Sequence, residues 1–240
     1  MKERESNVLS LLEDKTNIYA RKIALGIKTQ FGWKELTYDG LGLMSRRLAA
    51  YLMNDLGIQR GEKLAILSES KPEYGVCVFA SVISGLITVP LDIKLTKYEL
   101  QSILTDCLPS VMLVSQSYID KALELQKVIP SLKHIIVMDE HPVNENLQSI
   151  YTIPNNYTCK WRHRSRKSVV FIIYTSGTTG NPKGVETTFG NMLAQLKDLK
   201  TAFNQILPYG DVRVLSILPM NHLFEMTVGF STFLNLGFSV

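Results

Sequence analysis

The chain has 240 residues, 45% of them hydrophobic and 20% charged, and a formal net charge of +4. This composition is that of an ordinary soluble globular protein, long enough to bury one sizeable core or two modest ones. Its three cysteines, Cys77, Cys107 and Cys159, are far apart and form no C-x-x-C pair. This pattern favours reduced structural thiols in a cytosolic protein over a disulfide framework.

Seven short runs rich in Val, Ile and Leu predict β-strands, and helical patterns lie between them. Because these runs show little polar alternation, they are typical of strands buried on both faces, and their alternation with helices favours a mostly parallel sheet. We therefore assign the chain to the α/β class, with mostly parallel sheets and flanking helices. The predicted strands are residues 23–27, 63–67, 86–90, 111–114, 134–138, 169–174 and 212–218.

Two of the predicted helices carry clear start signals. Thr37 can cap a helix that runs to Leu56, before a glycine. Thr96 and Glu99 form a T-x-x-E capping box, in which the hydroxyl and the carboxylate satisfy free backbone N–H groups reciprocally.

The uncharged stretch at residues 74–91 approaches the length of a membrane span. It is interrupted by several glycine, serine and proline residues, however. We predict instead a buried helix that Ser70 and Pro72 open and that stops at Gly85, followed by a short strand. The start of the chain mixes both charge signs and leads into no apolar segment, so we expect no secretory signal there.

Residues 139–167 are the least patterned part of the chain, with two prolines and four asparagines. We interpret them as the junction between two α/β subdomains, at residues 1–160 and 161–240. The basic run KWRHRSRK, residues 160–167, carries five of the 26 basic residues. Such a run can contact nucleic acid or an anionic membrane, but a solvated loop is the commoner role. We expect no nucleic-acid partner, because the rest of the chain is nearly neutral.

The stretch YTSGTTGNPKG, residues 174–184, combines hydroxyl side chains, glycines and one lysine directly after a predicted strand. In an α/β sheet, ligands bind at the carboxyl ends of the strands. Glycines let backbone N–H groups turn towards an anion, hydroxyls donate hydrogen bonds, and lysine supplies charge. The loop therefore predicts a phosphate site, made by Thr175, Ser176, Gly177, Thr178, Thr179, Gly180, Lys183 and Gly184.

This loop is not the P-loop of NTPases, which requires G-x-x-x-x-G-K followed by Ser or Thr. Pro182 stands where the second glycine belongs, and Gly184 follows Lys183 in place of a magnesium-binding hydroxyl. A long surface turn without a ligand remains the alternative.

YTSGTTGNPKG resembles the phosphate-loop signature of the adenylate-forming enzymes, the superfamily of acyl-CoA synthetases, peptide adenylation domains and luciferases. The resemblance covers nearly the whole chain, since GIQRGEKLAILSESKPEY and GLITVPLDIKLTKYEL also look like this family's amino-terminal region. LPMNHLFEMTVGF, residues 218–230, is similar to the LP-x-x-H-x-F-E segment of long-chain fatty acyl-CoA synthetases.

The resemblance implies an enzyme that activates a carboxylic acid with ATP as acyl-AMP and passes the acyl group to a thiol. Thr175 to Gly180 and Lys183 would hold the β- and γ-phosphates, where preorganised donors stabilise the leaving pyrophosphate. The implied partners are a fatty acid, ATP and coenzyme A, and a carrier-protein thiol as acceptor stays open. Mg2+ is also implied, with its main protein ligand expected beyond residue 240.

His222 matches a family position that borders the acyl pocket and helps to place the carboxylate, so the resemblance implies a catalytic role. Without the resemblance, a hydrogen-bonded structural histidine is the commoner interpretation. Glu225 is expected either to orient this segment or to cap the helix that begins there. Nearby apolar side chains are compatible with an aliphatic tunnel or with ordinary core packing; they are Met220, Leu223, Phe224, Met226 and Phe230.

Two local sequences depart from the family pattern. The family commonly has T-H-x-N after the loop, and this chain has Thr188, Phe189, Gly190 and Asn191 there. Phenylalanine cannot donate a hydrogen bond, which puts a polar role of that position in doubt. Arg166 and Lys167 precede the strand where the family is usually acidic.

The family's Y-G-x-T-E motif, ribose-binding aspartate and carboxy-terminal catalytic lysine are not found in the sequence. We therefore expect an amino-terminal fragment of a long-chain fatty acid–CoA ligase that does not complete adenylation alone. Two alternatives stay open: a non-catalytic or degenerate module that binds a nucleotide or an acyl group, and an acyl-AMP ligase that serves a carrier protein. We expect a cytoplasmic protein, and peripheral contact with a membrane stays open.

Overall fold

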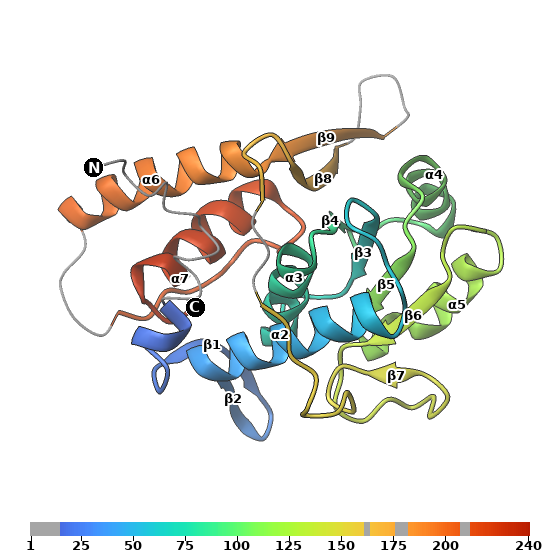
Figure 1. Cartoon of the computed structure of the whole chain (residues 1–240), viewed down its shortest axis with the longest axis horizontal. Helices are drawn as coiled ribbons and strands as arrows, with labels where there is room; N and C mark the ends of the chain where they lie inside the picture. Colours follow the sequence, from blue (N-terminus) through green and yellow to red (C-terminus); the bar gives the residue numbers. More distant parts are fainter. Residues whose placement is uncertain (1–14, 161–163, 176–181, 207–211) are drawn as a thin grey trace.

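The computed structural model describes residues 15–160, 164–175, 182–206 and 212–240 (Figure 1). Its strands are β1 (Ile23–Thr29), β2 (Gly32–Thr37), β3 (Lys63–Leu67), β4 (Ile87–Pro90), β5 (Val111–Val114), β6 (His134–Val137), β7 (Gln148–Ser149), β8 (Val169–Thr175) and β9 (Lys183–Thr188). Its helices are α2 (Tyr38–Asn54), α3 (Pro72–Ser84), α4 (Lys97–Cys107), η1 (Gln116–Tyr118), α5 (Ile119–Gln126), α6 (Phe189–Ile206), η2 (Glu225–Thr232) and α7 (Phe233–Leu236).

Within the described residues, one large sheet has the strand order β7-β6-β5-β3-β4-β8-β9, and β1 with β2 forms a separate antiparallel pair. Neighbours in the large sheet run parallel, except that β9 returns antiparallel to β8. Parallel neighbours need crossover connections, and helices supply most of them. The predicted α/β class with a mostly parallel sheet is confirmed.

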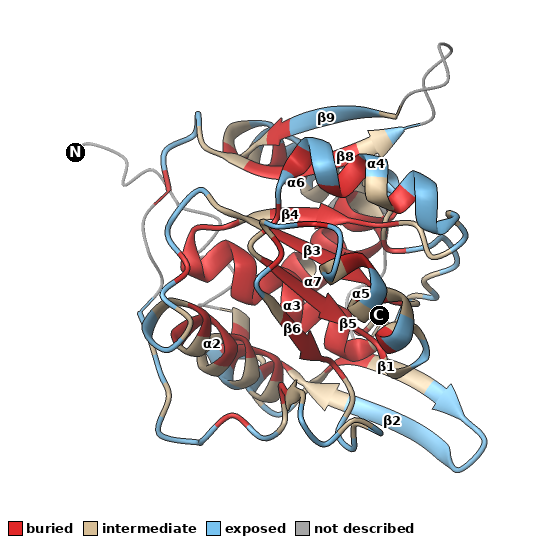
Figure 2. Ribbon diagram, turned by 90° about the vertical axis from the view of Figure 1, so that its right-hand side faces the viewer, coloured by how far each residue is buried: buried red, intermediate tan, exposed pale blue. Residues whose placement is uncertain are grey.

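Helices cover both faces of the large sheet, and the side chains of its central strand alternate between them. Leu64 and Ile66 of β3 pack into a core with α2 and α3. Ala65 and Leu67 face a second core with α4 and α5. Burying both faces of a strand explains its continuous apolar sequence, and the central strands are buried along most of their length (Figure 2).

The helix caps largely follow the sequence signals. The hydroxyl of Thr37 accepts a hydrogen bond from the backbone N–H of Gly40, and the Thr96–Glu99 capping box is complete. The uncharged helix is buried as α3 and ends at Gly85, whose φ of +84° glycine adopts without strain. Ser70 does not cap α3: its hydroxyl instead accepts a hydrogen bond from the backbone N–H of Met220 at 3.2 Å.

The predicted strand at residues 212–218 is wrong for most of its length. Arg213 forms an isolated parallel bridge with Ser239, and no strand continues from it. Leu215 and Ile217 are 81% and 79% exposed. A strand of this composition needs neighbours on both sides, and the described residues provide one neighbour over two residues only.

The predicted subdomain boundary at residues 160 and 161 falls between strands of one sheet. β8 lies after it and pairs with β4, which lies before it, through Thr88 and Phe171. The division into two subdomains therefore stays a prediction.

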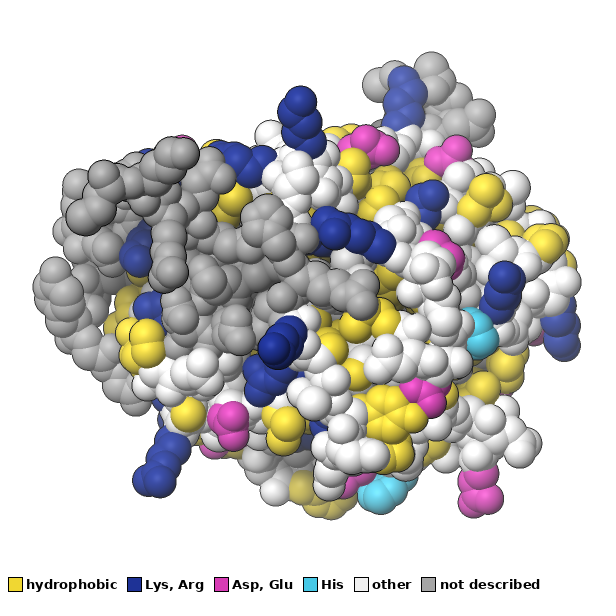
Figure 3. Space-filling model, viewed as in Figure 1, with side chains coloured by type: hydrophobic (Ala, Val, Ile, Leu, Met, Phe, Trp, Pro, Cys, Tyr) yellow, Lys and Arg dark blue, Asp and Glu magenta, His cyan; other side chains and the backbone are white. Residues whose placement is uncertain are grey.

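The basic run at 160–167 is only partly solvated where it is described. Arg164 is 3% exposed, and its Nη2 donates a hydrogen bond to the backbone oxygen of Leu86 at 2.5 Å. Burial, with a smaller effect of Arg60, lowers the pKa of Arg164 to about 10. On the described part of the face in Figure 3, Lys and Arg side chains are scattered rather than gathered in one patch.

Candidate functional site

The carboxyl ends of β3, β4, β5, β6 and β8 lie at one edge of the large sheet, because these strands are parallel. Polar side chains that follow three of them form a network there. The ammonium of Lys71 pairs with Asp139 and lies 3.8 Å from Glu69, whose carboxylate accepts a hydrogen bond from Ser115 at 2.6 Å. Sequence reasoning did not single out these residues, although each follows a predicted strand closely.

The predicted phosphate loop connects β8 to β9 at this edge. Thr175 ends β8, Lys183 begins β9, and the two residues are opposite each other in the ladder. Both are exposed. Ser176, Gly177, Thr178, Thr179 and Gly180 lie outside the described residues. The structure thus places Thr175 and Lys183 opposite each other at the two bases of the loop.

Gly184 is needed because a side chain at this position would clash with its neighbours, and not because of an unusual backbone conformation. It lies inside β9, and a Cβ atom there would come within 2.8 Å of Ile172 Cγ2 and 3.1 Å of Tyr174 Cζ. The Tyr174 hydroxyl donates a hydrogen bond to the carboxylate of Asp106 on α4. Burial and this hydrogen bond raise the pKa of Tyr174, so the ring ties β8 to α4 as a neutral phenol.

The T-F-G-N sequence after the loop starts helix α6. Thr188 and Asn191 cap the helix reciprocally: the Asn191 side chain accepts from the backbone N–H of Thr188, and the Thr188 hydroxyl accepts from that of Asn191. Phe189 is 1% exposed and belongs to the core. The Phe189 side chain therefore packs in the core. This agrees with the expectation that Phe189 cannot take a polar role at this position.

The segment that carries His222 reaches the same sheet edge. The hydrogen bond between Met220 and Ser70 attaches it to the loop that follows β3. The backbone N–H of His222 donates to Pro219 O, and its carbonyl accepts from the N–H of Met226, near the start of η2. The imidazole is exposed. Its predicted catalytic role stays a prediction.

Glu225 orients this segment from inside the protein. It is 4% exposed, and its carboxylate accepts a hydrogen bond from the Ser216 hydroxyl at 2.6 Å. The helix around it is π-helical from Glu225 to Thr232. A π-helical turn frequently marks a functional site, because it shifts the register of the side chains that follow.

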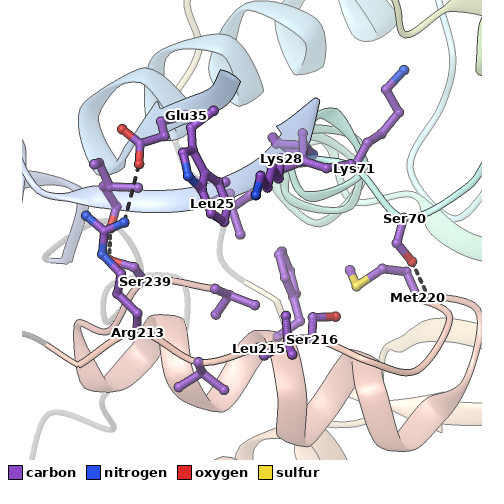
Figure 4. A pocket seen from close by; sticks show the side chains of 18 residues that line it. Leu25, Lys28, Glu35, Ser70, Lys71, Arg213, Leu215, Ser216, Met220 and Ser239 are labelled. Carbon is purple, nitrogen blue, oxygen red and sulfur yellow. Dashed lines mark hydrogen bonds and ion pairs between the residues drawn. The ribbon is translucent and has the colours of Figure 1, made fainter. Parts of the chain in front are cut away.

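The apolar residues near His222 do not all have the same surroundings. Met226 is fully buried in the core, whereas Phe224 is 63% exposed. Met220 and Phe230 line a cavity of about 460 Å³ between β1 and the segment 213–216 (Figure 4). Met226 is therefore a core residue. That apolar side chains near His222 line an aliphatic tunnel stays a prediction, and Met220 and Phe230 are the ones that line a cavity.

No group of three or more His, Cys, Asp or Glu side chains that could hold a metal ion is present among the described residues. None of their helices is both long enough and apolar enough to span a bilayer.

Comparison with known proteins decides the family. A family model described as AMP-binding enzyme matches residues 12–240. The chain belongs to this family. A long-chain-fatty-acid–CoA ligase of Salmonella typhimurium is 28% identical over 98% of this chain, which covers 46% of that ligase. A solved structure from Rhodopseudomonas palustris, titled as a long-chain-fatty-acid CoA ligase, has a TM-score of 0.83 and 21% identity, over 98% of this chain and 56% of that one.

A luciferin 4-monooxygenase of Photinus pyralis is also 28% identical, over 85% of this chain and 38% of that enzyme. Equal identity to two enzymes with different names means that identity at this level does not decide the substrate. The chain spans less than half the length of both curated relatives.

Proposed function

We propose that this chain forms the amino-terminal part of an AMP-forming acid–thiol ligase that acts on long-chain fatty acids. The observation that carries the proposal is the β8–β9 hairpin, whose loop sequence matches the family signature and whose bases hold Thr175 and Lys183 opposite each other. The LP-x-x-H-x-F-E segment and the resemblance to the Salmonella ligase support the fatty-acid class. Coenzyme A is the proposed acceptor, and a carrier-protein thiol is the alternative.

The residues of this chain would bind and orient the phosphates. ATP, when bound, supplies the group that activates the carboxylic acid. The Lys183 ammonium and the hydroxyls from Thr175 to Thr179 would neutralise and fix the phosphate oxygens through charge-assisted hydrogen bonds. The donor set fits a polyphosphate, because it combines a cation with hydroxyls at the carboxyl edge of a parallel sheet. His222, on the segment attached to Ser70, would place the acid's carboxylate.

Replacing Lys183 tests this assignment in a longer form of the protein. Lys183→Ala should lower fatty-acid-dependent ATP–pyrophosphate exchange by about 10²-fold, as expected for loss of one charged donor in a preorganised site. Lys167→Ala removes another exposed lysine, from just before β8, and should leave exchange unchanged. Equal rates for Lys183→Ala and the unmodified protein would count against the phosphate role.

A non-catalytic module that binds a nucleotide or an acyl group is the second candidate, and Phe189 at the usual histidine position favours it. It predicts that the longer protein binds ATP with no acid-dependent exchange. In the ligase proposal, the 240-residue chain alone gives no exchange, since the resemblance implies that a magnesium ligand and a catalytic lysine lie in the part of the relatives that it does not cover. Exchange by this chain alone would contradict that. We propose a cytoplasmic location for either candidate.

A further inference from the structure

Asp106 carries a negative charge where two neighbours disfavour one. It is the last residue but one of α4, whose last turn holds no basic residue, and the carboxyl end of a helix disfavours a carboxylate. It also contacts the hairpin whose loop we assign to phosphate, and a carboxylate repels a polyanion. Asp106 is exposed, so packing does not require it either. Its contact with the hairpin is therefore the feature that calls for an explanation.

The partner of Asp106 lies at the first base of the loop. The Tyr174 hydroxyl donates a hydrogen bond to the Asp106 carboxylate. Tyr174 directly precedes Thr175, the residue that ends β8. The hydrogen bond thus attaches the end of α4 to the end of β8, and Figure 1 and Figure 2 show this helix beside the hairpin.

The Tyr174 ring also contacts the second base of the loop. Tyr174 and Gly184 are opposite each other in the β8–β9 ladder. A Cβ atom on Gly184 would lie 3.1 Å from Cζ and 3.3 Å from Cε1 of the ring, so the ring lies across β9. Gly184 directly follows Lys183. One side chain therefore lies next to Thr175 on one strand and next to Lys183 on the other.

The hydrogen bond to Asp106 fixes the direction of this ring. The ring begins on the backbone of β8 and its hydroxyl is held by α4, so it cannot turn away from β9 without losing the bond. Burial, together with the hydrogen bond, raises the pKa of Tyr174, and the hydroxyl keeps the proton that it donates at neutral pH. A charged acceptor makes a stronger hydrogen bond than a neutral one, which gives the carboxylate a use here.

We propose that Asp106 is a positioning residue for the phosphate loop, and that it holds the backbones of Thr175 and Lys183 in place through the Tyr174 ring. The inference rests on the proposed phosphate role of the loop, and it concerns a residue that would not touch the phosphates itself. Positioning by Asp106 strengthens anion binding, whereas its charge alone weakens anion binding. The sign of its effect therefore separates the two roles.

Binding of inorganic triphosphate to the chain, measured by isothermal titration calorimetry, gives this sign. Asp106→Ala removes the charge and the acceptor, and it should weaken binding by about fivefold to tenfold, within what the loss of one hydrogen bond costs. Asp106→Asn removes the charge but keeps an acceptor oxygen, and it should bind within about twofold of the unmodified chain. Equal or tighter binding by Asp106→Ala would overturn the proposal.

A double variant tests whether Asp106 acts through Tyr174. Tyr174→Phe removes the other partner of the same hydrogen bond, so Asp106→Ala with Tyr174→Phe should bind triphosphate as tightly as either single variant. Effects that multiply would mean that the two residues act separately, against the proposal. Tyr157→Phe is the matched control, since it removes a tyrosine–aspartate hydrogen bond to Asp55 at the end of α2. It should leave the affinity unchanged.

Amide hydrogen exchange without ligand separates this inference from the proposed function. Asp106→Ala and Tyr174→Phe should speed exchange at the slower of the Lys183 and Gly184 amides by about threefold or more, because the hairpin base opens more often. Tyr157→Phe should not. Unchanged exchange in Asp106→Ala overturns the positioning role, whatever the affinities are. If exchange accelerates but the unmodified chain binds no triphosphate, the attachment by Asp106 is confirmed and the proposed phosphate role of the loop is overturned instead.

Discussion

At the scale of single residues, the packing of the candidate site depends on Gly184 having no side chain. Tyr174 is opposite it in the β8–β9 ladder, and the tyrosine ring occupies the space that a side chain at 184 would need. The same ring holds Asp106 of α4. Because Gly184 has no Cβ atom, the Tyr174 ring fits against β9 while its hydroxyl binds α4, and the hairpin base is thereby attached to that helix.

Gly184→Ala should destabilise the protein by roughly 1–3 kcal/mol, the usual cost of overpacking. Gly26→Ala is the matched control, since Gly26 also lies in a strand but its added Cβ would be 3.6 Å from the nearest atom, an ordinary contact. That change should alter stability by less than about 1 kcal/mol. Urea unfolding midpoints give the comparison, and equal midpoints for the two variants would show that Tyr174 moves aside freely.

At the scale of elements, the sequence predicts those strands and helices whose formation depends on residues close to them in the chain. The strands of the central sheet are recognisable because both of their faces are buried, as in β3. The capping residues Thr37 and Thr96 act within four residues of themselves, so their helices begin where expected. β2 and β9 escape prediction because most of their residues are exposed and their sequences carry no apolar run.

The elements that sequence reasoning gets wrong depend on distant partners. Residues 212–218 have the composition of a strand, but a ladder forms only at Arg213, where Ser239 is beside it. The π-helical stretch of η2 has no sequence signal that we can identify. Within the candidate site, the loop composition predicts a phosphate chemistry, whereas the contact between Tyr174 and Asp106 follows from the fold alone.

The capping box of α4 makes part of the stability depend on pH. Hydrogen bonds from the hydroxyl and the backbone N–H of Thr96 hold the pKa of Glu99 below its ordinary value of 4.5. A carboxyl with a lowered folded-state pKa adds stability above its unfolded-state pKa, and this stability is lost as the pH falls through the folded-state value. The unmodified protein should therefore be more stable than Glu99→Gln at pH 7, and the difference should shrink below about pH 4.5.

Urea unfolding of both proteins between pH 7 and pH 3 measures this difference. In a Thr96→Ala background, replacing Glu99 by Gln should leave a smaller pH dependence, because the hydroxyl that lowers the pKa is gone. A difference that is constant with pH in the original background would mean that the carboxylate charge does not contribute.

At the scale of the whole molecule, the two ends of the described chain are bound to each other. The Tyr38 hydroxyl, at the start of α2, lies 2.7 Å from Phe238 O and 3.0 Å from Leu234 O. Ser239 Oγ donates to Ile23 O at 2.7 Å. These contacts join β1 and α2 to α7, which Figure 1 shows close together, so we expect these elements to unfold in one cooperative transition.

Tyr38→Phe should lower the free energy of unfolding by roughly 1–3 kcal/mol, because it removes the one hydroxyl proton that the carbonyls of Leu234 and Phe238 share, and Tyr38 is 1% exposed. Tyr98→Phe removes a hydroxyl from a side chain that is 83% exposed and serves as the control, with little change expected. Calorimetry of both variants gives the values. A separate, earlier transition in Tyr38→Phe would show instead that α7 unfolds independently of the rest.

The pairing of β1 with Ser239 and Val240 also has a consequence for synthesis. Ile23 and Ser239 are 216 residues apart in the chain. At roughly 5–20 residues per second, a ribosome needs roughly 10 to 40 seconds to make that distance. Throughout this interval the nascent chain presents the outer edge of β1 without its partner, and an unpaired edge of this kind readily joins other strands. The β1–β2 hairpin is thus synthesised long before Ser239 and Val240, which pair with it. A chaperone that shields the edge of β1 would act during that interval.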